Sequence, residues 1–281
     1  MAFWRFGSKP REQRPRRAPN PHARGGQRSA GFFSNDVGRL LAGWDTSSNS
    51  IDYYLQTELR EMRARSRKMV RANPYGKRFI LMIKANIVGP VGVTIQAHAL
   101  DKDGKELDTT ANNAIEAAFK DWATYHCDYT GKSTWVDLQN MAISCAGQDG
   151  EFIFRRYFTG KYGYQLRCID PELLDVQKTG PTKSGGEIRL GVEYNTEDQV
   201  VFYWFREKLN SAYDAGQSYR VPASDIIHGF IPEWPDHSRG APWMHAALEK
   251  NKHLENYYES AIVKERSTAS TMAVIKSAAG D

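Results

Sequence analysis

The chain has 281 residues, of which 41% are hydrophobic and 12% aromatic, so it can bury the core of one or two domains and is not disordered throughout. The formal net charge of +5 is unevenly distributed, because residues 1–30 carry +7 and the remainder therefore sums to −2. A nearly neutral body joined to a basic tail argues against a body whose main task is to grip phosphates tightly.

The cysteines and the hydropathy indicate where the protein is made. Cys127, Cys145 and Cys168 form no Cys-x-x-Cys pair, and no histidines stand at the spacing of a zinc site. We therefore expect reduced thiols and synthesis in the cytoplasm. The longest apolar run, Phe79–Ile83, is too short to span a bilayer, and the start of the chain lacks the pattern of a signal peptide. These features predict a soluble protein made inside the cell.

The first 35 residues predict a disordered basic arm. Four prolines and a Gly25-Gly26 pair prevent a regular helix or a packed core. The candidate binding residues of this arm are Arg11, Arg14, Arg16, Arg17, Arg24 and Arg28. Such a composition suits binding to DNA or to acidic assembly partners, and an idle tether is the alternative.

Two helices are predicted next. From Ile51 to about residue 72, apolar residues recur at helical spacing, and six basic residues between positions 60 and 71 occupy the faces between them. This pattern predicts a helix with a strongly basic exterior, for which we favour solvation or salt bridges between subunits over nucleic-acid binding. Asn73-Pro74 then breaks the helix and starts a second one that ends at Gly89-Pro90.

The middle of the chain predicts a hairpin and two further helices. Val91–Leu100 is followed by a turn at Gly104 and a short return, which is typical of a β-hairpin. Ala111–His126 is the clearest helix of the sequence and can be capped by Thr109 or Thr110. Trp135–Gln148 repeats the same apolar periodicity and predicts another helix.

After Gly150 the pattern changes from helical to extended. Four short aromatic or β-branched runs, separated by glycine-rich turns, predict a mainly antiparallel sheet. They are Glu151–Phe158, Tyr164–Ile169, Ile188–Tyr194 and Val200–Arg206. Helices followed by strands predict the α+β class.

The last predicted element is a long helix from Pro242 to about Arg266. At 1.5 Å per residue it would be roughly 37 Å long, which exceeds the diameter of a small domain. Beyond it, Thr271–Ile275 begins an apolar strand for which the sequence offers no partner. We therefore expect the sequence to be a truncated piece of a longer protein.

Several short motifs could suggest an enzyme, and each has a simpler explanation. Gly131-Lys132-Ser133 matches only the end of a phosphate-binding P-loop. The pattern also needs a glycine at position 126, where this chain has His126, and a strand before it, where this chain has a predicted helix. Asp101, Asp103 and Glu106 imitate part of a calcium loop, but the ligand series stops there, which favours a hairpin turn.

Other polar residues also lack a catalytic pattern. The histidines at 237, 245 and 253 recur every eight residues but lack a third ligand, so a solvated or interface role is favoured over a metal site. The acidic residues near the start of the sheet have no spacing that indicates a two-carboxylate or two-metal centre; they are Asp149, Glu151, Asp170 and Glu172. We expect neither a catalytic site nor a cofactor.

Six segments occur in an order that is informative although each alone is weak. They are Ala72–Gly89 with its Asn-Pro turn, Gly147–Phe152, Leu166–Asp175, Leu190–Tyr194 with Val201–Trp204, Arg220–His228, and Arg239-Gly-Ala-Pro-Trp243. This series, from about residue 35 to 270, resembles the portal proteins of tailed bacteriophages, lambda family. In that family the last segment introduces the long stem helix.

The resemblance implies a structural, non-enzymatic subunit of a homo-oligomeric ring, usually a dodecamer, at one capsid vertex of the virion. Residues 36–237 would form the α+β wing domain, 238–267 the stem helix and 268–281 the start of a truncated clip. Double-stranded DNA would pass through the channel without being read, during packaging and ejection. The implied protein partners are the terminase, capsid or scaffold proteins and the head–tail adaptor; assembly would take place in the host cytoplasm, with no membrane involved.

The stem helix offers candidates for two roles. Lys250, Lys264 and Arg266 are candidates for loose phosphate contacts in the DNA channel. On what we expect to be the other side, Trp243, Leu254 and Tyr257 are candidates for contacts between neighbouring subunits.

Two other classes of function remain as alternatives. A DNA-packaging enzyme of the terminase or nuclease kind would need a complete P-loop or an acidic metal cluster. A sequence-specific DNA-binding protein would need a recognition helix on a compact domain.

Overall fold

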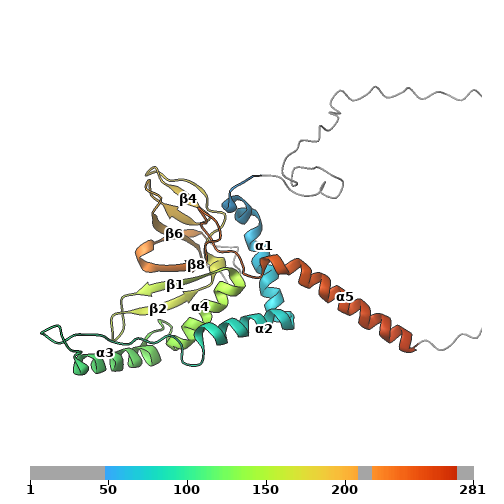
Figure 1. Ribbon diagram of the computed structural model, residues 1–281. Coiled ribbons are helices and arrows are strands. Elements are labelled where there is room, and N and C mark those ends of the chain that lie inside the picture. The colour runs from blue at the N-terminus through green and yellow to red at the C-terminus, as the bar shows by residue number, and fades with distance from the viewer. Residues whose placement is uncertain (1–47, 208–216, 271–281) are drawn as a thin grey trace, which may run out of the picture. The chain divides into compact units, whose positions relative to one another are not determined.

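The computed structural model describes residues 48–207 and 217–270 (Figure 1). The basic arm predicted for residues 1–35 and the strand predicted at Thr271–Ile275 lie outside the described residues. None of the described helices combines the length and the apolar character needed to cross a membrane.

The first two predicted helices are confirmed. Helix α1 spans Ile51–Ala72, and α2 spans Pro74–Ile83 before it continues as a π-helical turn, η2, over Lys84–Val88. Asn73 separates α1 from α2 with an extended backbone, and its side-chain oxygen accepts the backbone N–H groups of Tyr75 and Gly76. That bond caps α2, while Pro74 occupies a position in the helix that needs no N–H donor.

The predicted hairpin is confirmed only at its tip, where the turn at Gly104 is flanked by backbone bonds from Asp101 to Glu106 and from Asp108 to Ala99. Only one β-bridge joins Leu100 to Leu107, and the segment before Leu100 is not paired with another strand. Instead, the carboxamide of Gln139 bonds both N–H and C=O of Val93, and that of Asn112 does the same for Ala99. Each amide side chain thus takes the place of a neighbouring strand, which a pattern of hydropathy cannot reveal.

The next two helices hold the first core of the body. Helix α3 covers Thr109–Asp121 and is capped by Asp108 rather than by the predicted threonines; it continues as the π turn η3, Trp122–His126. Helix α4 covers Trp135–Asp149 and starts with a capping box. Trp122 and Leu138 are buried together, and the indole N–H of Trp122 donates to the carbonyl of Tyr164.

The strands form two antiparallel sheets. The three-stranded sheet has the order β2-β1-β8, and the five-stranded sheet has the order β3-β4-β5-β6-β7. Their bounds are β1 Glu151–Tyr157, β2 Gln165–Ile169, β3 Gly180–Pro181, β4 Glu187–Arg189, β5 Val192–Tyr194, β6 Val200–Arg206, β7 Ser218–Pro222 and β8 Ile226–Phe230, with short 3-10 turns η4 at Pro171–Leu173 and η5 at Ala223–Asp225. The prediction of antiparallel strands is confirmed.

The run predicted as one strand, Ile188–Tyr194, is two strands joined by a tight turn. Leu190 and Gly191 both have positive φ angles, of 50° and 85°, and they separate β4 from β5. A side chain at Gly191 would overlap the backbone of Asp175. The second core lies where both sheets contribute residues, among them Ile153 of β1, Phe205 of β6 and Ile226 of β8.

The long helix is also confirmed, with shifted bounds. Helix α5 spans His245–Ser270, so it begins three residues after the predicted Pro242 and is about 39 Å long at 1.5 Å per residue. Figure 1 shows α5 as a single rod that starts beside α1. The amide of Asn73 donates to the Glu255 carboxylate of α5 at 2.6 Å, and none of the residues of α5 is buried.

Candidate functional site

The body meets the start of α5 at a cluster of buried charged side chains. Glu151 is the first residue of β1 and follows Gly150, whose left-handed conformation ends α4. Three side chains converge on its carboxylate: Arg63 from the middle of α1, His228 from β8, and Arg239 from the segment that leads to α5. We call these four residues the ionic hub.

The groups of the ionic hub lie within hydrogen-bond distance of one another and are shielded from solvent. Glu151 Oε1 lies 2.6 Å from Nη2 of Arg239 and 2.7 Å from Nη2 of Arg63. The other carboxylate oxygen, Oε2, lies 3.0 Å from Nε2 of His228. The backbone N–H of Gly240 also donates to Oε2, at 3.0 Å. The side chains of Glu151 and Arg239 are 0% exposed and that of Arg63 is 1% exposed. Four donors therefore surround one carboxylate that water does not reach.

The two arginines bring more positive charge than one carboxylate can neutralise. Backbone carbonyl groups accept the remaining guanidinium N–H groups; they belong to Asp149, Pro171 and Gly240 for Arg63, and to Pro171, Leu174 and Leu190 for Arg239. The surplus charge is thus spread over carbonyl dipoles from several loops. In this way the ionic hub joins α1, both sheets and the root of α5.

Burial and the neighbouring arginines shift the pKa of Glu151 in opposite directions. Burial alone would raise the pKa of the Glu151 carboxyl, but the guanidinium groups of Arg239 and Arg63 outweigh it and hold that pKa well below its ordinary value. Burial lowers the pKa of Arg63, against the attraction of Glu151. The cluster is an ion network in which the opposite charges of Glu151 and the two arginines hold the joined segments in one geometry.

A second ion pair extends the network outward. Arg67, one helical turn after Arg63, lies 2.6 Å from Asp149 and 2.6 Å from Asp170. Burial raises the pKa of Asp149 despite the bonds that Arg67 donates. The prediction of a basic exterior is therefore wrong for Arg63 and Arg67, which point inward toward acids that are distant in the sequence. It holds for Arg65, which is exposed.

Two glycines allow this convergence. A Cβ atom at Gly150 would overlap the backbone at Ala241, and one at Gly240 would overlap the backbone of Gly150. The two chain segments pass so closely that only glycine fits at either position. The Gly-Glu and Arg-Gly pairs at 150–151 and 239–240 therefore belong to one structure.

Sequence reasoning missed the ionic hub, although one signal was available. Leu55, Leu59, Arg63 and Arg67 follow one another at intervals of four residues, so the two arginines continue the buried stripe of α1. An arginine on the apolar face of a helix requires an internal acid.

The candidate channel residues are exposed on α5. At about 100° per residue, Lys250 and Lys264 lie within about 40° of each other around the helix axis, whereas Arg266 lies about 160° from Lys250. The helix therefore brings the two lysines to one face but not the arginine.

The candidate interface residues are divided between two environments. Trp243 precedes α5 and packs beside Val70 and Met244 in a core cluster of its own chain. Leu254 and Tyr257 are 37% and 68% exposed, and by the same helical geometry they share the face of the two lysines. The expectation that lysines and apolar residues occupy opposite sides of this helix is therefore wrong.

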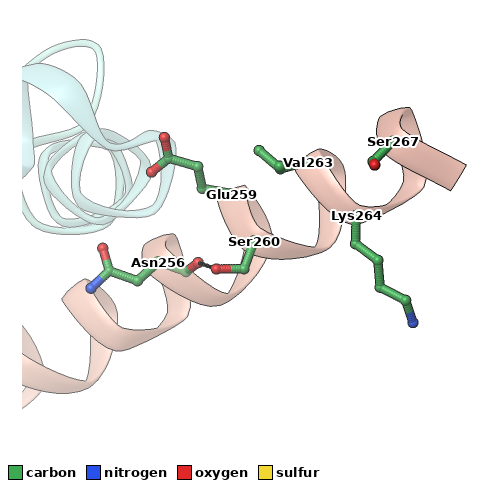
Figure 2. A pocket seen from close by; sticks show the side chains of 6 residues that line it. All are labelled: Asn256, Glu259, Ser260, Val263, Lys264 and Ser267. Atoms are coloured by element: carbon green, nitrogen blue, oxygen red, sulfur yellow. Dashed lines mark hydrogen bonds between the residues drawn. The ribbon is translucent and has the colours of Figure 1, made fainter. Parts of the chain in front are cut away.

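One hollow along α5 is shallow. Figure 2 shows its lining side chains, which all belong to α5: Asn256, Glu259, Ser260, Val263, Lys264 and Ser267. The Ser260 hydroxyl donates to the carbonyl of Asn256, at 2.8 Å. A hollow formed by one helix face is open and does not enclose a small-molecule site.

The P-loop-like segment has an internal explanation. The Asp128 carboxylate accepts the backbone N–H groups of Lys132 and Ser133, at 3.0 and 3.1 Å, and therefore occupies the place of a phosphate. The three spaced histidines are not brought together: His237 packs on Phe230, while His253 lies beside Glu249. In residues 48–207 and 217–270, no three His, Cys, Asp or Glu side chains are grouped to hold a metal ion.

Comparison with known proteins gives a consistent result. A family model described as "Phage portal protein, lambda family" matches residues 37–281. The chain is 30% identical over 234 residues to a probable portal protein of Halomonas phage phiHAP-1, covering 80% of this chain and 45% of that protein. It is 23% identical over 257 residues to portal protein B of Escherichia phage lambda, covering 81% and 46%. The chain thus spans a little under half the length of these relatives.

Proposed function

Because the chain belongs to the lambda family of phage portal proteins, we propose that it is part of a structural, non-enzymatic subunit of a ring-shaped channel at a capsid vertex. Double-stranded DNA passes through this channel during packaging and ejection, and the ring joins head to tail. The observation that carries the proposal is α5, a 26-residue helix with no buried residue.

The exposed side chains of α5 support a wall of several copies. Tyr257, Ile262 and Val263 are at least half exposed, although each is a large apolar residue. In an isolated subunit these surfaces remain in water, whereas neighbouring copies in a ring would cover them. A ring requires this kind of heterologous contact, in which two different faces of the same helix meet.

The ionic hub has a defined part in this proposal. It fixes the segment that enters α5 by bonds from Arg239 and Gly240 to a carboxylate of the body. The bond from Asn73 to Glu255 also holds α5 to the body, so the hub and this bond together would set the direction of the channel wall relative to the wing. Charged residues are suited to this task because an unpaired alternative arrangement would be costly.

Contact with DNA would be weak and independent of sequence. Lys250 and Lys264 share an exposed face of α5 and can each meet a phosphate, but each such contact adds a salt-dependent attraction that opposes movement. The near-neutral body agrees with a conduit through which DNA moves in both directions. The basic arm would bind DNA or acidic assembly partners, and the terminase, scaffold or capsid proteins and tail adaptor would bind surfaces of the complete protein.

Electron microscopy of the full-length protein tests the proposal. We expect rings with a central hole wide enough for duplex DNA, and α5 in the wall of that hole. A protein that stays monomeric at high concentration, with α5 packed back on its own body, would contradict the proposal.

A charge reversal tests the channel face separately. Lys250→Glu with Lys264→Glu should reduce DNA packaging or retention in particles assembled from the full-length protein, because two attractive contacts per subunit become repulsive. Lys252→Glu, which lies about 160° from Lys250 and about 120° from Lys264 around the same helix, is the control and should have little effect. Unchanged packaging and retention in the double variant would exclude these lysines from the channel.

A further inference from the structure

Two arginines of the three-stranded sheet lack a counter-charge. Arg155 of β1 and Arg167 of β2 are direct cross-strand partners, so their side chains stand side by side on one face of the sheet. Neither has an acidic group within 4.0 Å among the described residues, whereas the sheet arginines Arg189, Arg206 and Arg220 each have one. Like charges placed directly opposite one another destabilise a sheet, so this arrangement requires an explanation from outside the subunit.

Two tyrosines extend this pair into a larger surface. The guanidinium of Arg155 lies over the ring of Tyr157 at 5.2 Å, and Tyr157 stacks on Tyr129 with ring centroids 3.8 Å apart and an interplanar angle of 14°. The stack holds Arg155 in place, while Arg167 and Tyr129 are exposed. We call Arg155, Arg167, Tyr157 and Tyr129 the basic-aromatic patch. Pre-ordered guanidinium groups beside exposed aromatic rings are typical of protein interfaces.

The same chain carries a surface of opposite charge. A groove of about 550 Å³ lies between the start of α1 and the β4–β5 hairpin. Four acids and one arginine line it: Asp52, Glu187, Asp198, Asp236 and Arg189. The side chains of Glu187 and Asp198 are more than half exposed. Glu187 and Asp198 both pair with Arg189, at 3.0 and 2.8 Å, through one oxygen each, and Asp236 is exposed. The groove therefore holds a surplus of accessible carboxylate oxygen atoms.

We propose that the basic-aromatic patch of one subunit docks on the acidic groove of a second copy of this chain. This inference rests on the proposed ring, because a closed ring needs two different complementary surfaces on each subunit. The charges favour a protein partner over nucleic acid, since the body outside the arm is slightly acidic and would repel a polyanion. Carboxylates that face guanidinium groups can form paired hydrogen bonds, which also set the register between copies.

The decisive test uses the full-length protein and measures the subunit concentration at which half of it is in rings. Arg155→Glu with Arg167→Glu should raise that concentration by about tenfold or more, because two attractive contacts per interface become repulsive. Adding Glu187→Arg and Asp198→Arg to that variant should restore assembly, because each interface then has exchanged charges. Lys105→Glu, in the exposed turn between Leu100 and Leu107, is the control and should assemble like the original protein.

A single substitution distinguishes docking from a merely structural role. Arg167→Glu places a carboxylate directly opposite Arg155, so it removes a like-charge pair within the subunit. We expect the thermal stability of the dissociated subunit to stay the same or rise, while ring assembly weakens. A residue that served only folding would change both measurements in the same direction.

The outcomes separate the two proposals. If the unaltered protein forms rings and the double reversal assembles normally, the patch is not an interface. If assembly falls and the groove reversals fail to restore it, the groove is not the partner of the patch, and a capsid or scaffold protein would take its place. If the unaltered protein forms no rings, the proposed function itself fails.

Discussion

Two parts of the chain around α5 differ in which side chains they bury. The root, residues 239–244, lies beside buried charged groups, whereas the shaft, His245–Ser270, exposes apolar side chains. At the root, Glu151 and Arg239 are completely buried and every charge has a partner. Along the shaft, 26 residues include no buried position, and Tyr257 is 68% exposed. Buried, paired charge fixes one geometry, whereas exposed apolar surface is typical of sites that other chains cover. The difference supports the proposal that further copies of the subunit cover the shaft, whereas the body is stabilised by contacts within the chain.

Removing the central carboxylate should have the largest effect. Glu151→Gln keeps the shape of the side chain but leaves Arg63 and Arg239 buried without a counter-charge, so we expect a loss of about 3–5 kcal/mol in the free energy of unfolding at pH 7. Urea unfolding of this chain measures it. Glu187→Gln, on the exposed β4 strand, is the control and should cost under about 1 kcal/mol. A loss below about 1 kcal/mol for Glu151→Gln would show that the ionic hub does not hold the body together.

The stability difference between the original chain and Glu151→Gln should depend on pH in a way that follows from the lowered pKa of Glu151. The folded-state pKa of Glu151 lies well below the ordinary value of 4.5, so its contribution to stability is fully present above that value and is lost only as the pH falls toward the folded-state pKa. The difference between the original chain and Glu151→Gln should therefore be constant from pH 7 to about pH 5.5 and shrink at lower pH.

A smaller effect is expected from a buried histidine beside the root. Burial lowers the pKa of His237 below 6.5, and neither ring nitrogen has a hydrogen-bond partner among the described residues. The unfolded chain therefore binds a proton at a higher pH than the folded chain, so stability falls as the pH drops from about 7 toward the folded-state pKa, by at most about 1.4 kcal/mol per pH unit. His237→Phe should flatten this slope in unfolding experiments at several pH values. The exposed His253→Gln is the control, and parallel curves for all three proteins would rule out His237 as the cause.

The smallest effect on stability is expected where body and shaft meet. Asn73→Asp keeps the cap of α2 but replaces the amide donor by an oxygen that repels Glu255. Unfolding of the body should change by less than about 1 kcal/mol, while trypsin should cleave after Lys250 and Lys252 several-fold faster. Glu255→Gln removes the charge of the acceptor without introducing repulsion, so its cleavage rate should lie between those of the original chain and Asn73→Asp. Equal cleavage rates in all three proteins would show that this bond does not hold the shaft.

The sequence predicted the regular elements better than their contacts. Periodicity located α1, α4 and α5, because a helix that buries one face or presents one face repeats its apolar residues at 3.6-residue spacing. It failed for most of the strand predicted to begin at Val91, because the amide side chains of Gln139 and Asn112 replace its missing partner, whereas the turn at Gly104 forms as predicted. Helix α5 also begins three residues later than predicted, since Trp243 packs into the core of the body instead of extending the helix.

The ionic hub was beyond the reach of local patterns. Arg239 and Glu151 are 88 residues apart in the sequence, and a charge that is buried looks the same in composition as one that is solvated. The acidic residues at 149, 151 and 170 have no catalytic spacing because their partners lie on α1 and before α5. Only the fold brings these groups together.

Hydrogen exchange tests the contrast between body and shaft most directly. Amide groups of β1 and β8 should be strongly protected both in the dissociated subunit and in the assembled full-length protein. Those between Asn251 and Arg266 should exchange rapidly in the dissociated subunit and become protected on assembly. Equal protection of α5 in both states would contradict the account, because it would show that the helix is already supported by its own chain.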